Sequence, residues 1–514
     1  MAAGLLVGVA GPVAADPGDG AVVRTSDGTV RGIVAADHRT FHGIPYAAPP
    51  VDELRWRAPR PAPPWQGVRD ATQQPRPCPQ FGGTSPTDPP RLVGSEDCLF
   101  LTVDTPRGQD GPLPVLVFLH GGGFVTGVPA AYDPTPITVP GRVIVVTVAY
   151  RLGALGFLSH PALDDPYAGN FALADQQAAL RWVRRNIAVF GGDPGNVTLW
   201  GESAGAFATC AQLAAPGAAG LFDKAIVHSG PCGNRLLTRP VAERRGLATA
   251  AGLGCPNRRT AAECLRGKPY EDLVGLHDDQ VHGMHRRVDE LPWLPVTGTA
   301  ALPLQPLTAL RAGASARVPL IHGGTRDEMR AFVGQAYVEP GRPVTAAQYP
   351  EIVRDLFGAR EARPILDAYP HDRYPTPSLA LATLLSDYGG VQGTCGQLPA
   401  DDAAARRMPV YAYEFAEPSP LVTGDFPYGA YHGVDVPYFF DSRFPGATPT
   451  PRTERADTLS ARLIGHWTGF ARTGDPGQEW PAYRHGTGVS FTEERTGPID
   501  LVTEHRCDFW EAHR

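Results

Sequence analysis

Short runs of apolar residues recur along the chain and predict buried strands. Each run is rich in β-branched or aromatic residues, and Gly or Pro residues bound the runs. The runs are 114–119 (PVLVFL), 143–149 (VIVVTVA), 196–200 (NVTLW), 225–228 (AIVH), 318–322 (VPLIH) and 410–415 (VYAYEF). Continuous apolar runs of this length are typical of strands that are buried on both faces of a sheet.

Several of these runs are followed by the spacing of an amphipathic helix. In the stretch 171–190, apolar positions such as Leu173, Leu180 and Val183 recur at three- or four-residue steps, and Gly191-Gly192 ends the pattern. Strands that alternate with helices predict an α/β fold, with a mainly parallel central sheet and helices on both faces. Ligands of such sheets bind at the carboxyl ends of the strands, so functional motifs are expected there.

The pentapeptide Gly201-Glu202-Ser203-Ala204-Gly205 matches the pattern G-x-S-x-G. It follows the predicted strand 196–200 and precedes a helix-like segment, 206–215. A tight strand-to-helix turn holds such a serine in strained geometry with its hydroxyl above the sheet, and only glycines fit beside it. The pentapeptide alone also fits an ordinary turn. Its position between strand and helix favours a nucleophilic serine.

A second motif, His120-Gly121-Gly122-Gly123-Phe124, follows the predicted strand 114–119. Glycines let backbone amides approach a substrate oxygen because no side chain intervenes. We expect the amides of Gly122 and Gly123, with that of Ala204, to form an oxyanion hole. The alternatives are a structural glycine turn and a phosphate-binding loop, but a phosphate loop requires a lysine that is absent near this motif.

Composition and charge narrow the class of protein. The hydrophobic fraction of 42% and charged fraction of 19% are those of a globular chain. The formal net charge of −7 and the pI near 6.1 give no electrostatic support for binding nucleic acid. No cluster of Cys and His has the spacing of a zinc site, so no zinc is expected. Acyl transfer by a serine needs neither metal nor organic cofactor.

The first fifteen residues form a short apolar run that ends in small residues. Val13 and Ala15 suit the −3 and −1 positions of a cleavage site, although a basic segment in front of the run is missing. We interpret residues 1–15 as a truncated signal peptide, with a flexible tail as the alternative, and residues 16–514 as a single domain. No apolar stretch has the length of a membrane span.

These motifs and their surroundings resemble the type-B carboxylesterases, the family of α/β-hydrolases that includes the cholinesterases. The similarity runs from Phe41-His-Gly-Ile-Pro-Tyr to Cys507-Asp-Phe-Trp. Its most specific parts are SEDCLFLTV from Ser95, YRLGALGFL from Tyr150, and the long stretch from Asn170 to Gly205 that ends in GESAG. The resemblance implies an α/β-hydrolase fold and hydrolysis of carboxylic esters through an acyl-enzyme.

The resemblance also implies a Ser–His–Glu catalytic triad. Ser203 is the nucleophile, and the acid falls on Glu328 in Gly-Gly-Thr-Arg-Asp-Glu, where Asp327 is a rival on spacing alone. The base falls on His432 in Tyr-His-Gly-Val-Asp, in a loop after the predicted strand 410–415. The order Ser, acid, His is the one expected for this fold. His466 is the competing histidine, but it lies in a helix-like run.

Other positions match the family around the site and in the scaffold. Glu202, beside the nucleophile, is expected to tune the site electrostatically or to serve folding, and Ser229 resembles a serine that lies behind the triad. The pairs Arg55–Glu96 and Arg151–Asp175 resemble buried ion pairs of the family.

The eight cysteines fit an oxidising compartment if they form disulfides, and the alternative is buried free thiols. Cys255 and Cys264 close a short polar loop, and a Cys78–Cys98 bond would fix the segment before the first core strand. The resemblance supports both pairs and adds Cys395–Cys507. It leaves Cys210 and Cys232 either to pair or to stay free.

The sequence leaves the substrate and a second class of function open. The cholinesterases carry a tryptophan shortly before the SEDCL element, and 81–93 contains none, so a choline ester is not expected. An amidase, a lipase or a carbamate hydrolase could use the same machinery, and a cholinesterase-like binding module would be non-catalytic. We expect a secreted monomer or weak homodimer that acts on a small-molecule ester.

Overall fold

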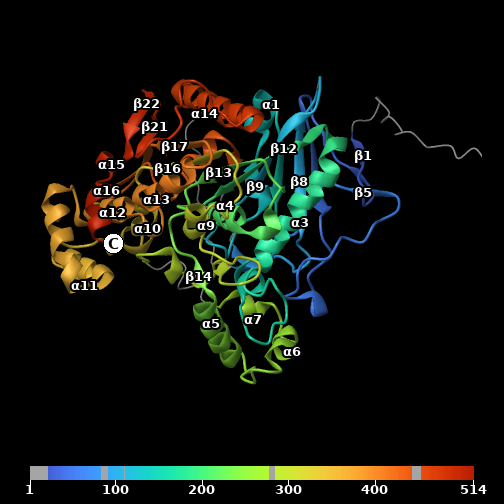
Figure 1. The fold of residues 1–514 in the computed structure, drawn as a ribbon, viewed down its shortest axis with the longest axis horizontal. Coiled ribbons are helices and arrows are strands. Elements are labelled where there is room, and N and C mark those ends of the chain that lie inside the picture. Colours follow the sequence, from blue (N-terminus) through green and yellow to red (C-terminus); the bar gives the residue numbers. More distant parts are fainter. Residues whose placement is uncertain (1–20, 83–90, 109, 277–283, 443–452, 514) are drawn as a thin grey trace, which may run out of the picture.

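The computed structural model describes residues 21–82, 91–108, 110–276, 284–442 and 453–513. The predicted signal peptide, 1–15, lies outside these residues. The centre of the fold is an eleven-stranded sheet (Figure 1). In spatial order its strands are β22 (Thr496–Asp500), β21 (Thr487–Phe491), β17 (Val410–Phe415), β16 (Leu320–Thr325), β13 (Lys224–His228), β12 (Gly192–Glu202), β9 (Leu113–Leu119), β11 (Ile144–Val148), β8 (Phe100–Pro106), β4 (His38–Pro45) and β3 (Ile33–Val34).

The strands from β21 to β11 are all parallel, and antiparallel strands flank them at both edges of the sheet. The α/β prediction is therefore confirmed, and every predicted apolar run contributes a strand. Bounds differ at the run 196–200, where β12 begins at Gly192 and ends at Glu202, and at the run 318–322, where β16 begins at Leu320 and continues to Thr325. The apolar pattern ends at His322, but the backbone pairing with β17 continues through Gly323 and Gly324.

Strand β9 shows how the sheet separates two hydrophobic cores. Val115, Val117 and Leu119 belong to one core, whereas Leu116 and Phe118 belong to the other. Successive side chains of a strand point to opposite faces, so a continuous apolar run is needed where both faces are covered.

Helices cover both faces (Figure 1). The core of Val115 includes residues of α3 (Phe171–Asn186), α4 (Ala204–Ala214), α12 (Pro377–Tyr388) and α13 (Thr394–Ala405). The core of Phe118 includes residues of α1 (Thr135–Gly141) and α14 (Glu454–Thr473). The helix predicted over 171–190 is α3 followed by one 3-10 turn, Ile187–Phe190. No helix in the described ranges is both long enough and apolar enough to cross a membrane.

The remaining helices and strands lie around this centre. The further helices are α2 (Gly153–Phe157), α5 (Arg239–Gly252), α6 (Ala261–Arg266), α7 (Glu271–Val274), α9 (Pro306–Ala312), α10 (Met329–Val333), α11 (Gln348–Ala368), α15 (Leu501–Glu504) and α16 (Cys507–Ala512). The further strands are β1 (Val22–Arg24), β2 (Thr29–Arg31), β5 (Val68–Asp70), β6 (Gln80–Gly82), β7 (Arg91–Val93), β10 (Tyr132–Asp133), β14 (Leu237–Thr238), β15 (Val296–Thr297), β18 (Ser419–Thr423), β19 (Phe426–Gly429) and β20 (Asp441–Ser442).

All eight cysteines are paired. The structure contains the three expected bonds, Cys78–Cys98, Cys255–Cys264 and Cys395–Cys507. It also answers the question that the sequence left open, because Cys210 in α4 is bonded to Cys232 after β13. Both expected ion pairs are present and largely buried, with Arg55 Nη2 at 2.6 Å from Glu96 Oε2 and Arg151 Nη2 at 2.7 Å from Asp175 Oδ1.

Candidate active site

Ser203 lies at the turn between β12 and α4. Its backbone has φ 55° and ψ −119°, a conformation that costs an L-residue energy and is found at functional sites. Side chains at Gly201 or Gly205 would collide with the carbonyl groups of Gly205 and Leu119, respectively, so the turn requires both glycines. The amide of Ser203 donates to the carbonyl of His228 at 2.9 Å, which ties the turn to the end of β13.

His432 approaches this serine from a distant part of the sequence. It follows β19 and places Nε2 at 2.9 Å from Ser203 Oγ, across a separation of 229 residues. This is hydrogen-bonding distance, so the serine hydroxyl can donate its proton to the imidazole.

Glu328 lies on the other side of the imidazole. Its Oε2 is 2.5 Å from His432 Nδ1, while its Oε1 accepts a hydrogen bond from the amide of Thr325 at 2.8 Å. The carboxylate is nearly fully buried, and Gly324 leaves the room for it, because a side chain there would collide with Oε1. Glu328 therefore holds the imidazole in the tautomer whose Nε2 faces the serine.

Electrostatics at His432 favour its protonated form. Burial by itself lowers the pKa of His432, but the adjacent Glu328 carboxylate, with smaller contributions from Glu202 and Asp435, outweighs burial and raises the pKa to about 9. The same carboxylates would stabilise the imidazolium that forms when the imidazole takes the serine proton.

The two rival residues have other partners. Asp327 binds Arg330 at 2.9 Å and accepts a hydrogen bond from the amide of Ala430, also at 2.9 Å. His466 lies in α14, where its Nδ1 is 2.8 Å from the carbonyl of Pro476. Neither side chain contacts Ser203 or His432 in the described part of the chain.

The glycine loop after β9 has a backbone conformation that requires glycine and leaves two of its amides without a partner in the described residues. Gly122 and Gly123 have φ values of 106° and 59°, which favour glycine, and the carbonyl of Gly122 accepts bonds from the amides of Val125 and Thr126 at 3.0 Å. Within the described residues the amides of Gly122, Gly123 and Ala204 donate no hydrogen bond. The glycine loop and the first turn of α4 therefore carry three backbone amides without a hydrogen-bond partner in the described residues.

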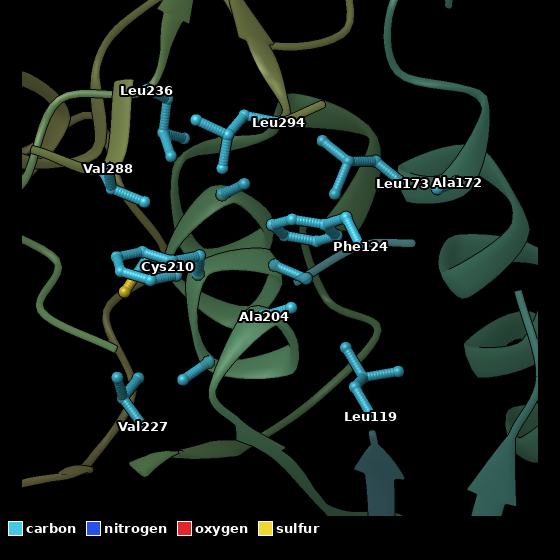
Figure 2. Packing of buried hydrophobic residues seen from close by; sticks show 14 of the residues in the cluster. Leu119, Phe124, Ala172, Leu173, Ala204, Cys210, Val227, Leu236, Val288 and Leu294 are labelled. Atoms are coloured by element: carbon cyan, nitrogen blue, oxygen red, sulfur yellow. The ribbon is translucent and has the colours of Figure 1, made fainter. Parts of the chain in front are cut away.

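Helix α4 carries Ala204 at its first position, where an amide has no partner inside the helix. Figure 2 shows Ala204 and Cys210 in the apolar packing around this helix, with Phe124 from the glycine loop and Leu119 from the end of β9. The glycine loop and the turn at Ser203 thus pack on one hydrophobic core.

The two residues expected near the triad are both in place. Glu202 Oε1 is 3.6 Å from His432 Nε2, and burial raises the pKa of Glu202. Ser229 is buried at a φ of 58°, and its amide donates to the carbonyl of Gly323 at 2.7 Å. The hydroxyl of Ser229 has no partner among the described residues.

Three side chains at the site were not identified from the sequence. His228 and Asp435 form a buried pair, with Nε2 at 2.5 Å from Oδ2. The ring of Phe332 lies 5.3 Å from the ring of His432, centre to centre. Asp435 lies inside the motif that identified His432, so the motif indicated that Asp435 lies near the site. Nothing in the sequence indicated that Asp435 contacts His228.

The arrangement brings together groups that acyl transfer requires: a serine hydroxyl, an imidazole within hydrogen-bonding distance of it, a carboxylate that orients the imidazole, and backbone amides without partners in the described part of the chain. No group of three or more Cys, His, Asp or Glu side chains in the described ranges could hold a metal ion.

Comparison with known proteins agrees with this chemistry. The family model described as the carboxylesterase family matches residues 19–510. The para-nitrobenzyl esterase of Bacillus subtilis (strain 168) is 34% identical over 490 residues, covering 91% of this chain and 93% of that protein. Carboxylesterase 5A of Felis catus is 32% identical over 518 residues, covering 91% and 89%. A solved structure of a PNB esterase superposes with a TM-score of 0.78 at 31% identity, covering 95% of this chain and 99% of that one.

Proposed function

This chain belongs to the carboxylesterase family and is a carboxylic ester hydrolase, and from that premise we propose that Ser203, His432 and Glu328 are its catalytic triad. The observation that carries the proposal is the convergence of three residues from distant parts of the chain. His432 lies within hydrogen-bonding distance of Ser203 on one side and of Glu328 on the other.

In the acylation step, Ser203 Oγ attacks the ester carbonyl carbon while its proton moves to His432 Nε2. Glu328 keeps the Nδ1 proton of His432 in place and stabilises the imidazolium. The tetrahedral intermediate then collapses, the C–O bond to the alcohol breaks, and His432 gives its proton to the departing alkoxide. The product of this half-reaction is an acyl-Ser203 ester.

The oxyanion of the tetrahedral intermediate is proposed to accept hydrogen bonds from the amides of Gly122, Gly123 and Ala204. These amides donate to no other group in the described residues, so they need not break a hydrogen bond to accept the oxyanion. Donors that are fixed before the reaction cost no reorganisation when charge develops.

In the deacylation step, water takes the place of the alcohol. His432 removes a proton from the water, the hydroxyl attacks the acyl carbon, and the proton passes to Ser203 as the carboxylic acid leaves. Neither step needs a metal or an organic cofactor.

For the substrate, we propose small carboxylic esters without a quaternary ammonium group. The relative from Bacillus subtilis is named for a para-nitrobenzyl ester. The stretch 81–93 of this chain has no tryptophan to bind a choline cation, and its residues 83–90 lie outside the described part.

The setting proposed for the enzyme is extracellular, as a single domain of residues 16–514 after removal of a signal peptide at 1–15. Four disulfides support this assignment, because such bonds form and persist in oxidising compartments. Cleavage after Ala15 can be checked by sequencing the N-terminus of the protein recovered from the culture medium.

The triad is tested with Ser203→Ala, assayed on p-nitrophenyl acetate and p-nitrophenyl butyrate. Ser460→Ala is the matched control, because Ser460 is a buried serine whose hydroxyl donates to the carbonyl of Tyr438, on the other face of the sheet. We expect S203A to fold and to lose at least a thousandfold in kcat, and S460A to keep the parental kcat. Parental activity in folded S203A would refute the assignment.

A further inference from the structure

A second buried pair of a histidine and a carboxylate lies next to the proposed triad. His228 Nε2 is 2.5 Å from Asp435 Oδ2, and each side chain is only 1% exposed. In the triad mechanism neither residue transfers a proton or forms a bond. Buried charged groups are expensive unless they are paired, so a pair at this position calls for an explanation.

The pair connects the two elements that carry the nucleophile and the base. His228 is the last residue of β13, and its carbonyl accepts the hydrogen bond from the amide of Ser203. Asp435 lies three residues after His432 and directly before the 3-10 turn Val436–Tyr438. One side-chain contact therefore spans 207 residues of sequence and joins the strand behind Ser203 to the loop of His432.

We propose that His228 and Asp435 are positioning residues that hold the loop of His432 at the distance from Ser203 that proton transfer requires. The inference rests on the proposed triad. Its physical basis is that His432 and Asp435 lie in one hydrogen-bonded turn, in which the amide of Val434 donates to the carbonyl of Tyr431 at 3.1 Å. An anchor on Asp435 therefore holds the turn that carries His432.

The surroundings of His228 make it a rigid anchor. Its ring is parallel to that of Trp200 at 6.3 Å between centres and meets the edges or faces of Tyr413 and Phe439 at 6.1 and 6.0 Å. These three aromatic residues belong to one buried core. The imidazole therefore has little freedom to move, and its hydrogen bond fixes the position of Asp435.

Charge adds to the anchoring. Burial by itself lowers the pKa of His228, but Asp435, with Glu202 and Glu328 nearby, outweighs burial and raises it. A protonated His228 makes the contact with Asp435 a charge-assisted hydrogen bond, which is stronger than a neutral one. The positive charge of a protonated His228 also offsets the negative charge of one of the three carboxylates near His432.

The fold contains a second buried pair of a histidine and an aspartate, which serves as a control for His228 and Asp435. It tests whether breaking any buried pair of this kind lowers kcat. On the neighbouring strand β16, His322 Nδ1 is 2.6 Å from Asp401 Oδ1, and both side chains are equally buried. Asp401 lies in α13 and also binds Gln397 at 2.8 Å. This pair contacts none of the three triad side chains, so breaking it should cost stability without moving His432.

The experiment compares His228→Leu, Asp435→Ala and the double variant with His322→Leu, using p-nitrophenyl butyrate. We expect each of the first three to lower kcat by roughly tenfold or more with KM within about threefold, since displacing a catalytic group by about 1 Å can cost a hundredfold in rate. The rate of labelling by a fluorophosphonate should fall by the same factor. H322L should keep the parental kcat although it melts at a lower temperature.

Two further comparisons make the result specific. The double variant should lose no more than the worse single variant, because the two residues act as a unit. His228→Gln, whose amide can still donate to Asp435, should recover most of the kcat lost in H228L. If H228L does not fold, the test uses the double variant, because removing both groups leaves no unpaired charge in the interior.

The inference is overturned if the folded double variant has the parental kcat, if the single losses multiply in the double variant, or if H322L loses as much kcat as H228L. S203A is assayed in parallel. If S203A keeps the parental activity, the triad itself is refuted. If S203A is inactive while the double variant is fully active, only the positioning role is refuted.

Discussion

The carboxylate of Glu328 lies 2.5 Å from His432 Nδ1, although 104 residues separate them in the chain. The contact joins the loop after β16 to the loop after β19. A second contact between the same loops, from Asp327 to the amide of Ala430, lies beside it at 2.9 Å. Two adjacent carboxylates thus hold one loop, one through the imidazole and the other through the backbone.

These two carboxylates are expected to respond differently to removal of their charge. Glu328→Gln should lower kcat by about a thousandfold or more, because the amide can favour the wrong imidazole tautomer and does not stabilise the imidazolium. Asp327→Asn is the matched control and should lose less than tenfold, because its partners are Arg330 and a backbone amide. Steady-state kinetics of both variants on p-nitrophenyl butyrate measure these two losses in kcat. An equal loss in both variants would contradict the assignment of Glu328 as the triad acid.

The activity of the free enzyme should rise toward alkaline pH. The base must be neutral to accept the serine proton, and its pKa is raised to about 9, so the neutral fraction grows as the pH rises through that value. We expect kcat/KM to increase up to about pH 9 and then to level off. In E328Q, loss of the neighbouring negative charge lowers the pKa of His432 and should move the rise to lower pH. A profile that is flat between pH 7 and 10 would be inconsistent with this electrostatic account.

Gly122→Ala should reduce kcat by about a hundredfold or more, the typical cost of losing an oxyanion donor. A methyl group at this position would collide with the carbonyl of Thr126, and the φ of 106° disfavours alanine, so the loop must shift its amides. Gly341→Ala is the control for backbone strain alone, because Gly341 has φ 72° with open space around it. We expect G341A to melt at a lower temperature with an unchanged kcat. Unchanged kcat in G122A would argue against an oxyanion hole in this loop.

The disulfides should differ in their contribution to stability according to the length of chain that they close. Cys395–Cys507 spans 112 residues, and Cys255–Cys264 spans 9. Loop-closure entropy predicts that breaking the longer loop lowers the free energy of unfolding by about 2 kcal/mol more. Denaturant unfolding of C395A/C507A and C255A/C264A measures the difference. A larger loss in the shorter loop would show that the packing around the bonds, and not chain entropy, decides their effect.

Much of the fold could be predicted from the sequence because its central strands are buried on both faces. A strand such as β9 must be apolar at every position, and this leaves a continuous run that is easy to recognise. The edge strands β3 and β22 carry exposed and polar positions, and no apolar run identified them. The motifs around Ser203 and Gly122 could be located for a related reason, since tight turns restrict which residues fit.

Contacts between distant side chains could not be predicted in the same way. Nothing near Cys210 or Cys232 indicates that the two sulfurs meet, because the meeting depends on how α4 packs on the end of β13. The contact between His228 and Asp435 could not be predicted from the sequence for the same reason. A histidine at the end of a buried strand can be neutral or charged, and only the position of the partner carboxylate determines which state is favoured.

The most direct test of the account is the mass of the enzyme after inactivation by a fluorophosphonate. The account predicts that one phosphonyl group is added per chain, that activity is lost in proportion, and that the group is recovered on Ser203 within the Gly201–Gly205 peptide. The S203A variant should remain unlabelled. Full labelling with undiminished activity, or a label on another residue that accounts for the loss, would contradict the claim that Ser203 is the nucleophile.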